Sequence, residues 1–209
     1  MKQYILMADI ISSRTKNQNQ LLTSFKTLVH NTNLAFQENI LSPLTITLGD
    51  EFQGIIKNAN TAIDIIIHLE QSSIKNNVDY KLRYVLYYGD VETPVNYEIA
   101  YGMLGEGLTI AREELNTLKS GKERFFINTK EILKDQILNE AFNIYNNIVN
   151  RWNVDRDHEI ISALIEEGDY KKVAKKLNRN RSLIWKRSHS LNISEYNSIK
   201  KIIALTLSI

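Results

Sequence analysis

The sequence predicts an α+β protein, in which a ferredoxin-like antiparallel sheet with helices is followed by a small all-α helix-turn-helix domain. Within residues 1–90, strand-like and helix-like patterns follow each other in the order βαββαβ. Beyond residue 155 only helical periodicity occurs, and two of these helical segments are separated by three turn residues. We therefore expect two domains, residues 1–150 and residues 155–209.

Four strands and two helices are predicted for residues 1–90. Short runs rich in β-branched and aromatic residues indicate the strands, and apolar residues at helical spacing indicate the helices. Ser42 and Pro43 are expected to stop the first helix. The strands are predicted at 4–8, 44–48, 52–56 and 81–88, and the helices at 18–39 and from about residue 60 onward.

The next segment has a proline and three glycines within residues 91–107, which predicts a loop or a short strand. A helix over 108–118, a strand over 124–127 and a helix over 130–149 with Thr129 as its N-cap are expected to follow. The polar stretch 150–157 is the predicted domain boundary.

The C-terminal part reads as four helices. Asn178, Arg179 and Asn180 form the turn between the second and the third of them, where Asn178 suits the left-handed conformation and Asn180 suits an N-cap. The predicted helices cover 158–167, 170–177, 181–191 and 194–207.

Composition excludes several classes of protein. The chain has 209 residues, of which 43% are hydrophobic, enough to build a core. It contains no cysteine, which excludes disulfides, thiolate nucleophiles and zinc sites built on sulfur. No leader and no membrane-spanning apolar run is recognised, so we expect a cytoplasmic protein that does not bind membranes.

Charge is distributed unevenly along the chain. Residues 170–209 contain ten Lys or Arg and one acid, Glu195, which gives +9. Because the whole chain carries +2, residues 1–169 carry −7. A basic tail on an acidic body indicates nucleic acid as a partner, although solvated helix faces also carry such charge.

Asp9 and the segment LGDEF at 48–52 resemble the nucleotidyl cyclase and GGDEF superfamily, whose palm domain has the same βαββαβ order. In that family two acidic residues and a main-chain carbonyl bind two Mg²⁺ ions. The resemblance implies Asp9, Asp50 and the Ile10 carbonyl as magnesium ligands, with Glu51 beside them. The alternative is a pair of aspartates that only cap local structure.

Other cyclase positions differ in this sequence. Thr109 and Glu113 stand where active class III cyclases have asparagine and arginine, and the purine-reading lysine would fall near Ile46. Arg112 lies one residue away and is the remaining candidate for charge stabilisation. Residues after the first strand would hold phosphate through main-chain amides. The candidate nucleotide-binding residues are therefore Ser12, Ser13, Glu51 and Arg112.

Nearly the whole chain resembles the bacterial SatD family, named for a role in secretion and acid tolerance. The resemblance rests on ADIISSR at 8–14, GDEFQ at 49–53 and the helix-turn-helix at 170–191. It implies a DNA-binding regulator.

The helix-turn-helix places basic and polar residues where such units contact DNA. The alternative is a helical bundle with a solvated basic face, and Trp185 is equally suited to a core. The candidate DNA-binding residues are Lys171, Lys172, Lys175, Arg181, Ser182, Trp185, Lys186 and Arg187.

Three functional hypotheses remain open. The favoured one is a DNA-binding transcriptional regulator of the SatD type, with a degenerate cyclase-like palm that binds a nucleotide and Mg²⁺. The second is a divergent nucleotidyl cyclase or nucleotidyltransferase that uses two Mg²⁺ ions on Asp9 and Asp50. The third is a palm that serves only to dimerise the DNA-binding tail. Because operators are often palindromic, we expect a homodimer.

Overall fold

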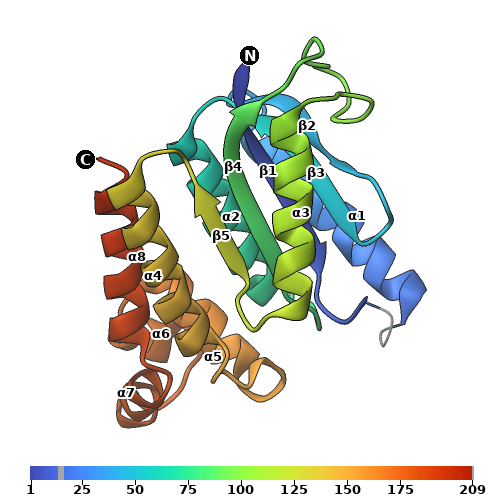
Figure 1. The fold of residues 1–209 in the computed structure, drawn as a ribbon. Helices are drawn as coiled ribbons and strands as arrows, with labels where there is room; N and C mark the ends of the chain where they lie inside the picture. Colours follow the sequence, from blue (N-terminus) through green and yellow to red (C-terminus); the bar gives the residue numbers. More distant parts are fainter. Residues whose placement is uncertain (14–16, 209) are drawn as a thin grey trace.

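The structure is a computed structural model, and it describes residues 1–13 and 17–208. A five-stranded sheet forms the centre of the molecule, and helices cover both of its faces and one of its edges (Figure 1). The strands, in chain order, are β1 Lys2–Ile10, β2 Ile40–Ile46, β3 Glu51–Ile56, β4 Leu82–Asp90 and β5 Phe125–Asn128.

The spatial order of the strands is β2-β3-β1-β4-β5. The first four strands pair antiparallel, and β5 adds to β4 in parallel. Together with two helices, α1 Gln18–Ala35 and α2 Ala59–Lys75, the antiparallel strands make the predicted βαββαβ unit with the ferredoxin-like strand order. The α+β fold class and the order of its elements are confirmed.

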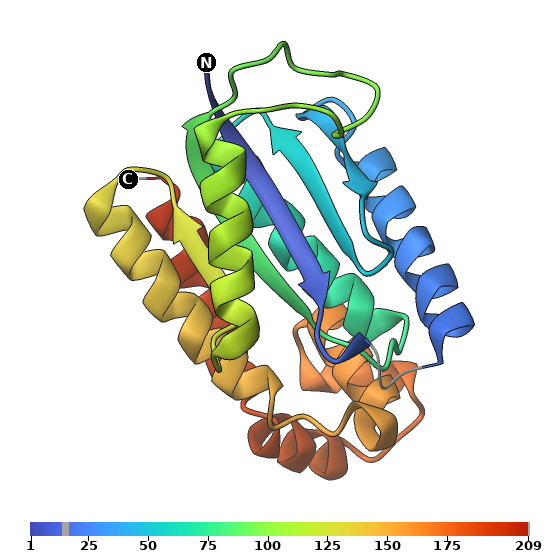
Figure 2. The same ribbon diagram turned by 45° about the vertical axis from the view of Figure 1, so that its right-hand side comes forward.

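The two faces of the sheet are covered differently. Helices α1 and α2 bury residues such as Phe25 and Ile66 against one face. Helix α3, Glu106–Ser120, lies across the other face, where it buries Leu108 and Leu115 against Met7 and neighbouring strand residues (Figure 2). Strand residues alternate between the faces, so every second residue of β1, β3 and β4 points toward α3.

Helix α3 approaches the sheet closely at its first turn. A Cβ added to Gly107 would lie 2.6 Å from the backbone of Gly89, and a Cβ added to Gly89 would lie 2.8 Å from the Gly107 Cα. Such distances are shorter than real Cβ contacts, so both positions need glycine. This contact fixes where the later turns of α3 cross the strands.

The remaining helices stack beside β5 and below the sheet (Figure 1). Helices α4 and α8 pack on each other, and Tyr145 and Trp152 lie against Tyr196. These helices are α4 Ile132–Val149, α5 Val154–Glu167, α6 Tyr170–Lys176, α7 Arg181–Ser190 and α8 Ile193–Thr206.

Several predicted boundaries were wrong. Helix α1 ends at Ala35 and β2 already starts at Ile40, so Pro43 lies within a strand rather than stopping the helix. The strand tolerates proline because β2 is at the sheet edge and its pairing is irregular at that point. Thr129 is not the N-cap of α4: it donates to Asp135, and the cap residue is Glu131.

The predicted division into residues 1–150 and 155–209 stays a prediction. Helix α5 begins inside the polar stretch, capped by Asn153, whose side chain accepts a hydrogen bond from the Arg156 amide. One hydrophobic cluster continues from the sheet through α2 and α4 into the C-terminal helices. Among the described helices, none combines the length and apolar character that crossing a bilayer requires.

Candidate functional site

Three charged residues form one row across the end of the sheet. Glu51 in β3 and Arg83 in β4 are the cross-strand partners of Asp9 in β1. Because partners in register share a face, all three point to the face that α3 covers, as Met7 and Val85 do. Asp9 and Glu51 are almost completely buried there.

Helix α3 contributes two cations to this row. Lys119 Nζ lies 3.7 Å from Asp9 Oδ2 and 3.5 Å from Glu51 Oε2, so one ammonium group bridges the two acids. Arg83 Nη1 lies 3.2 Å from Asp9 Oδ2. Arg112 Nη1 forms a close ion pair with Glu51 Oε1. We call these five residues the acid–cation cluster.

Burial and charge act in opposite directions on Asp9. Loss of solvent raises the pKa of its carboxyl group, and the nearby Asp50 carboxylate adds to this rise. Arg83 and Lys119 lower the pKa, but they do not cancel the effect of burial, so the net shift is upward. Ionised Asp9 therefore depends on its two cationic partners.

The other predicted residues of this site lie around the turn that precedes β3. The Asp50 carboxylate accepts a hydrogen bond from the Ser13 hydroxyl at 2.5 Å, and the Asp50 carbonyl accepts one from the Ile10 amide at 2.9 Å. Ser12 follows β1 with a positive φ of 58°. The structure thus brings Asp9, Glu51 and Arg112 together and places Asp50, Ile10 and Ser13 directly beside them.

The donor set does not suit a divalent cation in this arrangement. Both acids of the cluster already face Lys119, and Arg83 and Arg112 occupy their remaining sides. Within residues 1–13 and 17–208, no three His, Asp or Glu side chains are arranged to hold a metal ion. Magnesium binding through Asp9, Ile10 and Asp50 stays a prediction.

Sequence reasoning missed Arg83, Lys119 and Gln53 as members of this site. Gln53 is the next residue of β3 on the α3 face; its side-chain oxygen accepts from Arg112 at 3.4 Å and its amide donates to the Ala100 carbonyl. Lys119 lies seven residues after Arg112 on α3, a spacing that puts both on one helix face. That spacing was the available signal for Lys119.

A cavity of 420 Å³ opens beside the cluster, between the sheet and the start of α3. Gln53 and Arg112 form its polar side, and Met7, Met103 and Leu108 form its apolar side. Thr109 and Glu113, which stand at the cyclase asparagine and arginine positions, also line it. The cavity combines a guanidinium, a carboxylate, a side-chain amide and apolar walls.

In the segment predicted as a helix-turn-helix, the turn between α6 and α7 has the local geometry that the sequence predicts. Asn178 has a φ of 49°, in the left-handed region, and the Asn180 side chain accepts a hydrogen bond from the Ser182 amide at the start of α7. Within the described helix α7, Ile184 is the one fully buried residue. The rest of α7 is exposed or half-buried at the lower end of the molecule (Figure 1).

The cations of this segment fall into two groups. Lys176, Arg179 and Arg187 pair with acids on α5; Lys176 Nζ, for example, lies 2.8 Å from Glu166. In the part of the chain that the structure describes, the second group has no ion-pair partner and is exposed. It consists of Lys171, Lys172, Lys175, Arg181 and Lys186.

Arg187 differs from the other predicted DNA-binding residues. Its guanidinium holds the buried carboxylate of Asp157, with Nε 2.9 Å from Oδ1, and thereby links α7 to α5. Trp185 is 45% exposed, and its ring lies edge-on to His189 at 4.3 Å. Trp185 is therefore a surface residue rather than a core residue.

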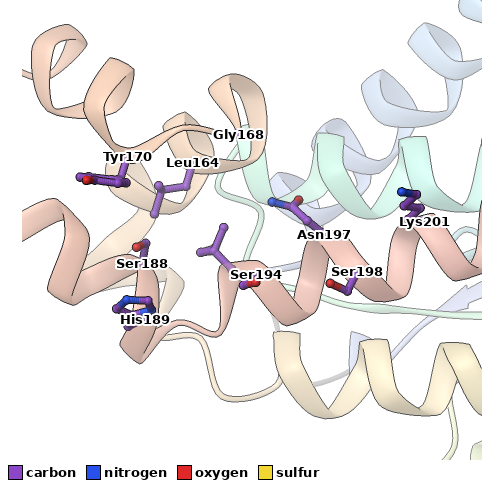
Figure 3. Close-up of a pocket in the computed structure, with 10 residues that line it drawn as sticks. Leu164, Gly168, Tyr170, Ser188, His189, Ser194, Asn197, Ser198 and Lys201 are labelled. Atoms are coloured by element: carbon purple, nitrogen blue, oxygen red, sulfur yellow. The ribbon is translucent and has the colours of Figure 1, made fainter.

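A second cavity, of 380 Å³, lies among the C-terminal helices. Figure 3 shows Ser188 and His189 of α7 on one side and Ser194, Ser198 and Lys201 of α8 on the other. Its lining mixes hydroxyl and amide groups with the apolar side chains of Leu164 and Ile193. None of the predicted site residues lines it.

Two solved structures of a bacterial light-regulated adenylyl cyclase are similar to this chain. The first has a TM-score of 0.41 and 10% sequence identity, and the match covers 61% of this chain and 43% of the cyclase chain. The second has a TM-score of 0.39 and 12% identity, with coverages of 61% and 42%. The chain thus spans less than half the length of these proteins, and a likeness this low supports no argument about activity.

A search of curated proteins finds no match. A family model does match, from residue 4 to residue 207, and so includes the acid–cation cluster as well as helices α6 and α7. Because this match extends over nearly the whole chain, the protein belongs to the SatD family.

Proposed function

We propose that this protein is a DNA-binding transcriptional regulator that contacts duplex DNA with helices α6 and α7. The observation that carries the proposal is the exposed surface of α7. At 100° per residue, Ser182, Lys186 and His189 lie opposite the buried Ile184, and Trp185 lies at the edge of the outward stripe that they form. A helix presented in this way is the element that helix-turn-helix proteins insert into the major groove.

The unpaired cations support the same function. Lys171, Lys172 and Lys175 lie on α6, and Arg181 and Lys186 lie on α7. Exposed ammonium and guanidinium groups without acidic partners attract backbone phosphates and release counter-ions on binding. Ser182, Trp185 and Lys186 are the candidates for contact with base edges.

Adjacent lysines of α6 provide a matched test. Among residues 1–13 and 17–208, Lys175 has no acidic partner, whereas Lys176 pairs with Glu166 and Glu167 at 2.8 and 3.0 Å. Titrating the full chain with a duplex of mixed sequence at several salt concentrations measures the number of phosphate contacts. We expect Lys175→Ala to reduce the slope of log K against log salt by about 0.9. Lys176→Ala should leave the slope nearly unchanged.

Combined variants sharpen this test. Changing Lys171, Lys175 and Lys186 together to Ala should weaken binding and reduce the slope by about 2 to 3. Absence of salt-sensitive binding by the unmodified protein, or equal slopes for Lys175→Ala and Lys176→Ala, would contradict the proposed DNA contact.

A second candidate function is nucleotide binding in the cavity beside α3. Its support is the presence of Arg112 and Gln53 next to apolar walls in a space of 420 Å³. Calorimetric titration with ATP and GTP, with and without Mg²⁺, tests this, and Arg112→Gln should abolish any binding seen. Release of pyrophosphate from either nucleotide, lost in Asp50→Asn, would support the enzyme hypothesis.

The expected homodimer also stays a prediction. A two-fold dimer would present two copies of α7 to two half-sites about 34 Å apart. Sedimentation velocity of the full chain, alone and with DNA, distinguishes a dimer from a monomer.

A further inference from the structure

We propose that Lys119 and Arg83 are built-in counter-ions of Asp9 and Glu51 and replace divalent metal ions at the end of the sheet. The two acids form a metal site only when Lys119 is removed. This role of the acid–cation cluster does not depend on DNA binding.

The position of Lys119 is the first argument. Its ammonium group lies 3.7 Å from Asp9 Oδ2 and 3.5 Å from Glu51 Oε2, between two acids that come from neighbouring strands. A metal ion shared by these carboxylates would have to occupy the same space. One cation from α3 therefore does the bridging that a bound ion would do.

The carboxylate oxygens are the second argument. Arg83 Nη1 lies 3.5 Å from Asp9 Oδ1 and 3.2 Å from Asp9 Oδ2. Glu51 Oε1 accepts from Arg112 and, at 3.2 Å, from the Thr47 hydroxyl, while Oε2 faces Lys119. All four oxygens are thus engaged, although magnesium and calcium bind through free carboxylate oxygens.

Charge balance is the third argument. The cluster holds two buried acids and three cations, Arg83, Arg112 and Lys119, so it already has one positive charge in excess. Adding a divalent ion would raise this excess to three in a partly dehydrated site, where charges interact strongly. Removing Lys119 eliminates the excess, frees Glu51 Oε2 and leaves Arg83 as the cation on Asp9 Oδ2.

Lys119 is the residue best suited to substitution. Its side chain is 40% exposed, and it is the penultimate residue of α3, so an alanine there leaves the buried core of the helix intact. Lys122, three residues later, is exposed and in the described chain has no acidic partner. Lys122→Ala removes the same charge without touching the acids and is the matched control.

The experiment is a titration of the full chain with Mn²⁺ alone. Binding is measured as the loss of the free Mn²⁺ signal in electron paramagnetic resonance. We expect the unmodified protein and Lys122→Ala to bind Mn²⁺ weakly or not at all, and Lys119→Ala to bind it about tenfold more tightly or better, because one repelling charge is gone. Adding Asp9→Asn to Lys119→Ala should abolish the gain.

Two results would overturn the proposal. In the first, the unmodified protein binds Mn²⁺ with the same affinity as Lys119→Ala, and Asp9→Asn abolishes this binding. The other is a folded Lys119→Ala, judged by circular dichroism, that binds Mn²⁺ no better than Lys122→Ala. Lys119→Met, which keeps most of the side-chain volume, provides a second variant, and the measurement on the unmodified protein tests the proposal without any substitution.

Discussion

At the scale of single residues, the two tryptophans have opposite environments. Trp152 is 7% exposed, packs on Tyr196 and donates from its indole nitrogen to the Leu191 carbonyl at 2.7 Å. Trp185 projects from α7 and touches His189. One tryptophan therefore belongs to the core, and the other belongs to the proposed DNA-binding surface.

Substituting each tryptophan separates stability from binding. Trp152→Ala should lower the free energy of unfolding by about 3 to 5 kcal/mol, because it leaves a cavity and removes the hydrogen bond to the end of α7. Trp185→Ala should change stability by only about 0.5 kcal/mol and weaken DNA binding. Urea denaturation and DNA titration of both variants measure the two effects, and an equal loss of stability in both would contradict this assignment.

A second residue-scale prediction concerns the buried pair of Arg124 and Glu70. Arg124 donates to both Glu70 oxygens at 3.0 and 2.8 Å, and also to Asn146 and to the Leu82 carbonyl. Arg124→Met should cost about 3 to 5 kcal/mol, because Glu70 is left as a buried charge without a partner. Changing Glu70→Leu as well should cost less than the sum of the single changes. Denaturant titration of the three variants gives the coupling.

At the scale of elements, the contact between α5 and α7 determines how firmly the proposed reading helix is held. Burial alone would raise the pKa of Asp157, but hydrogen bonds from Arg187 and Arg156 outweigh burial and lower it. Asp157 lies in the first turn of α5 and Arg187 in the last turn of α7. This ion pair therefore connects the start of one helix to the end of the other.

The lowered pKa predicts how stability depends on pH. Because the folded state binds the Asp157 proton less tightly than the unfolded state, the stabilisation is complete above the unfolded pKa of about 3.9. It is lost as the pH falls through the lower pKa of the folded state. Asp157→Asn should lower the free energy of unfolding by about 1.5 to 3 kcal/mol at pH 7. The free energy of unfolding of this variant should then decrease less in acid than that of the unmodified protein. Thermal unfolding between pH 7 and pH 2.5 measures both stabilities. An equal loss of stability on acidification in the variant and in the unmodified protein would contradict the prediction.

The turn between α6 and α7 gives another prediction at this scale. Asn178 has a φ of 49°, which costs most side chains roughly 1 kcal/mol but costs glycine nothing. Asn178→Gly should retain stability and DNA binding, whereas Asn178→Ala should lose about 1 kcal/mol. Chemical denaturation compares the two variants, and a more stable Asn178→Ala would show that the turn has another geometry in solution.

At the scale of the whole molecule, polar contacts join the C-terminal helices to α2. Gln71 donates to the Tyr196 hydroxyl at 3.2 Å, and a ring nitrogen of His158 lies 3.0 Å from the Lys75 carbonyl. The same hydrophobic cluster includes Ile66 of α2 and Ile161 of α5. Such continuity favours a single cooperative unit.

We therefore expect one unfolding transition for the full chain. Tryptophan fluorescence reports the C-terminal helices, because Trp152 and Trp185 both lie there, whereas far-ultraviolet circular dichroism reports all the helices. The two signals should change together during urea denaturation, with one midpoint. Two separate midpoints would instead support independent folding of residues 1–150 and 155–209.

Local patterns were sufficient for much of the fold and for part of the candidate site. The order of strands and helices, the left-handed Asn178 and the Asn180 cap depend on residues close together in the chain. Local patterns also indicated that Asp9 and the GDEF turn lie at strand ends, which brings them together if the two strands are neighbours in one sheet.

What only the tertiary structure decided is which charges meet. Strand register and the alternation of side chains put Glu51, rather than Asp50, across from Asp9 on the α3 face. Lys119 follows both acids by more than sixty residues in the chain. It reaches them only because α3 packs over that face. The sequence by itself determined a pair of carboxylates at the end of a sheet, whereas packing determined that lysine and arginine side chains are their partners.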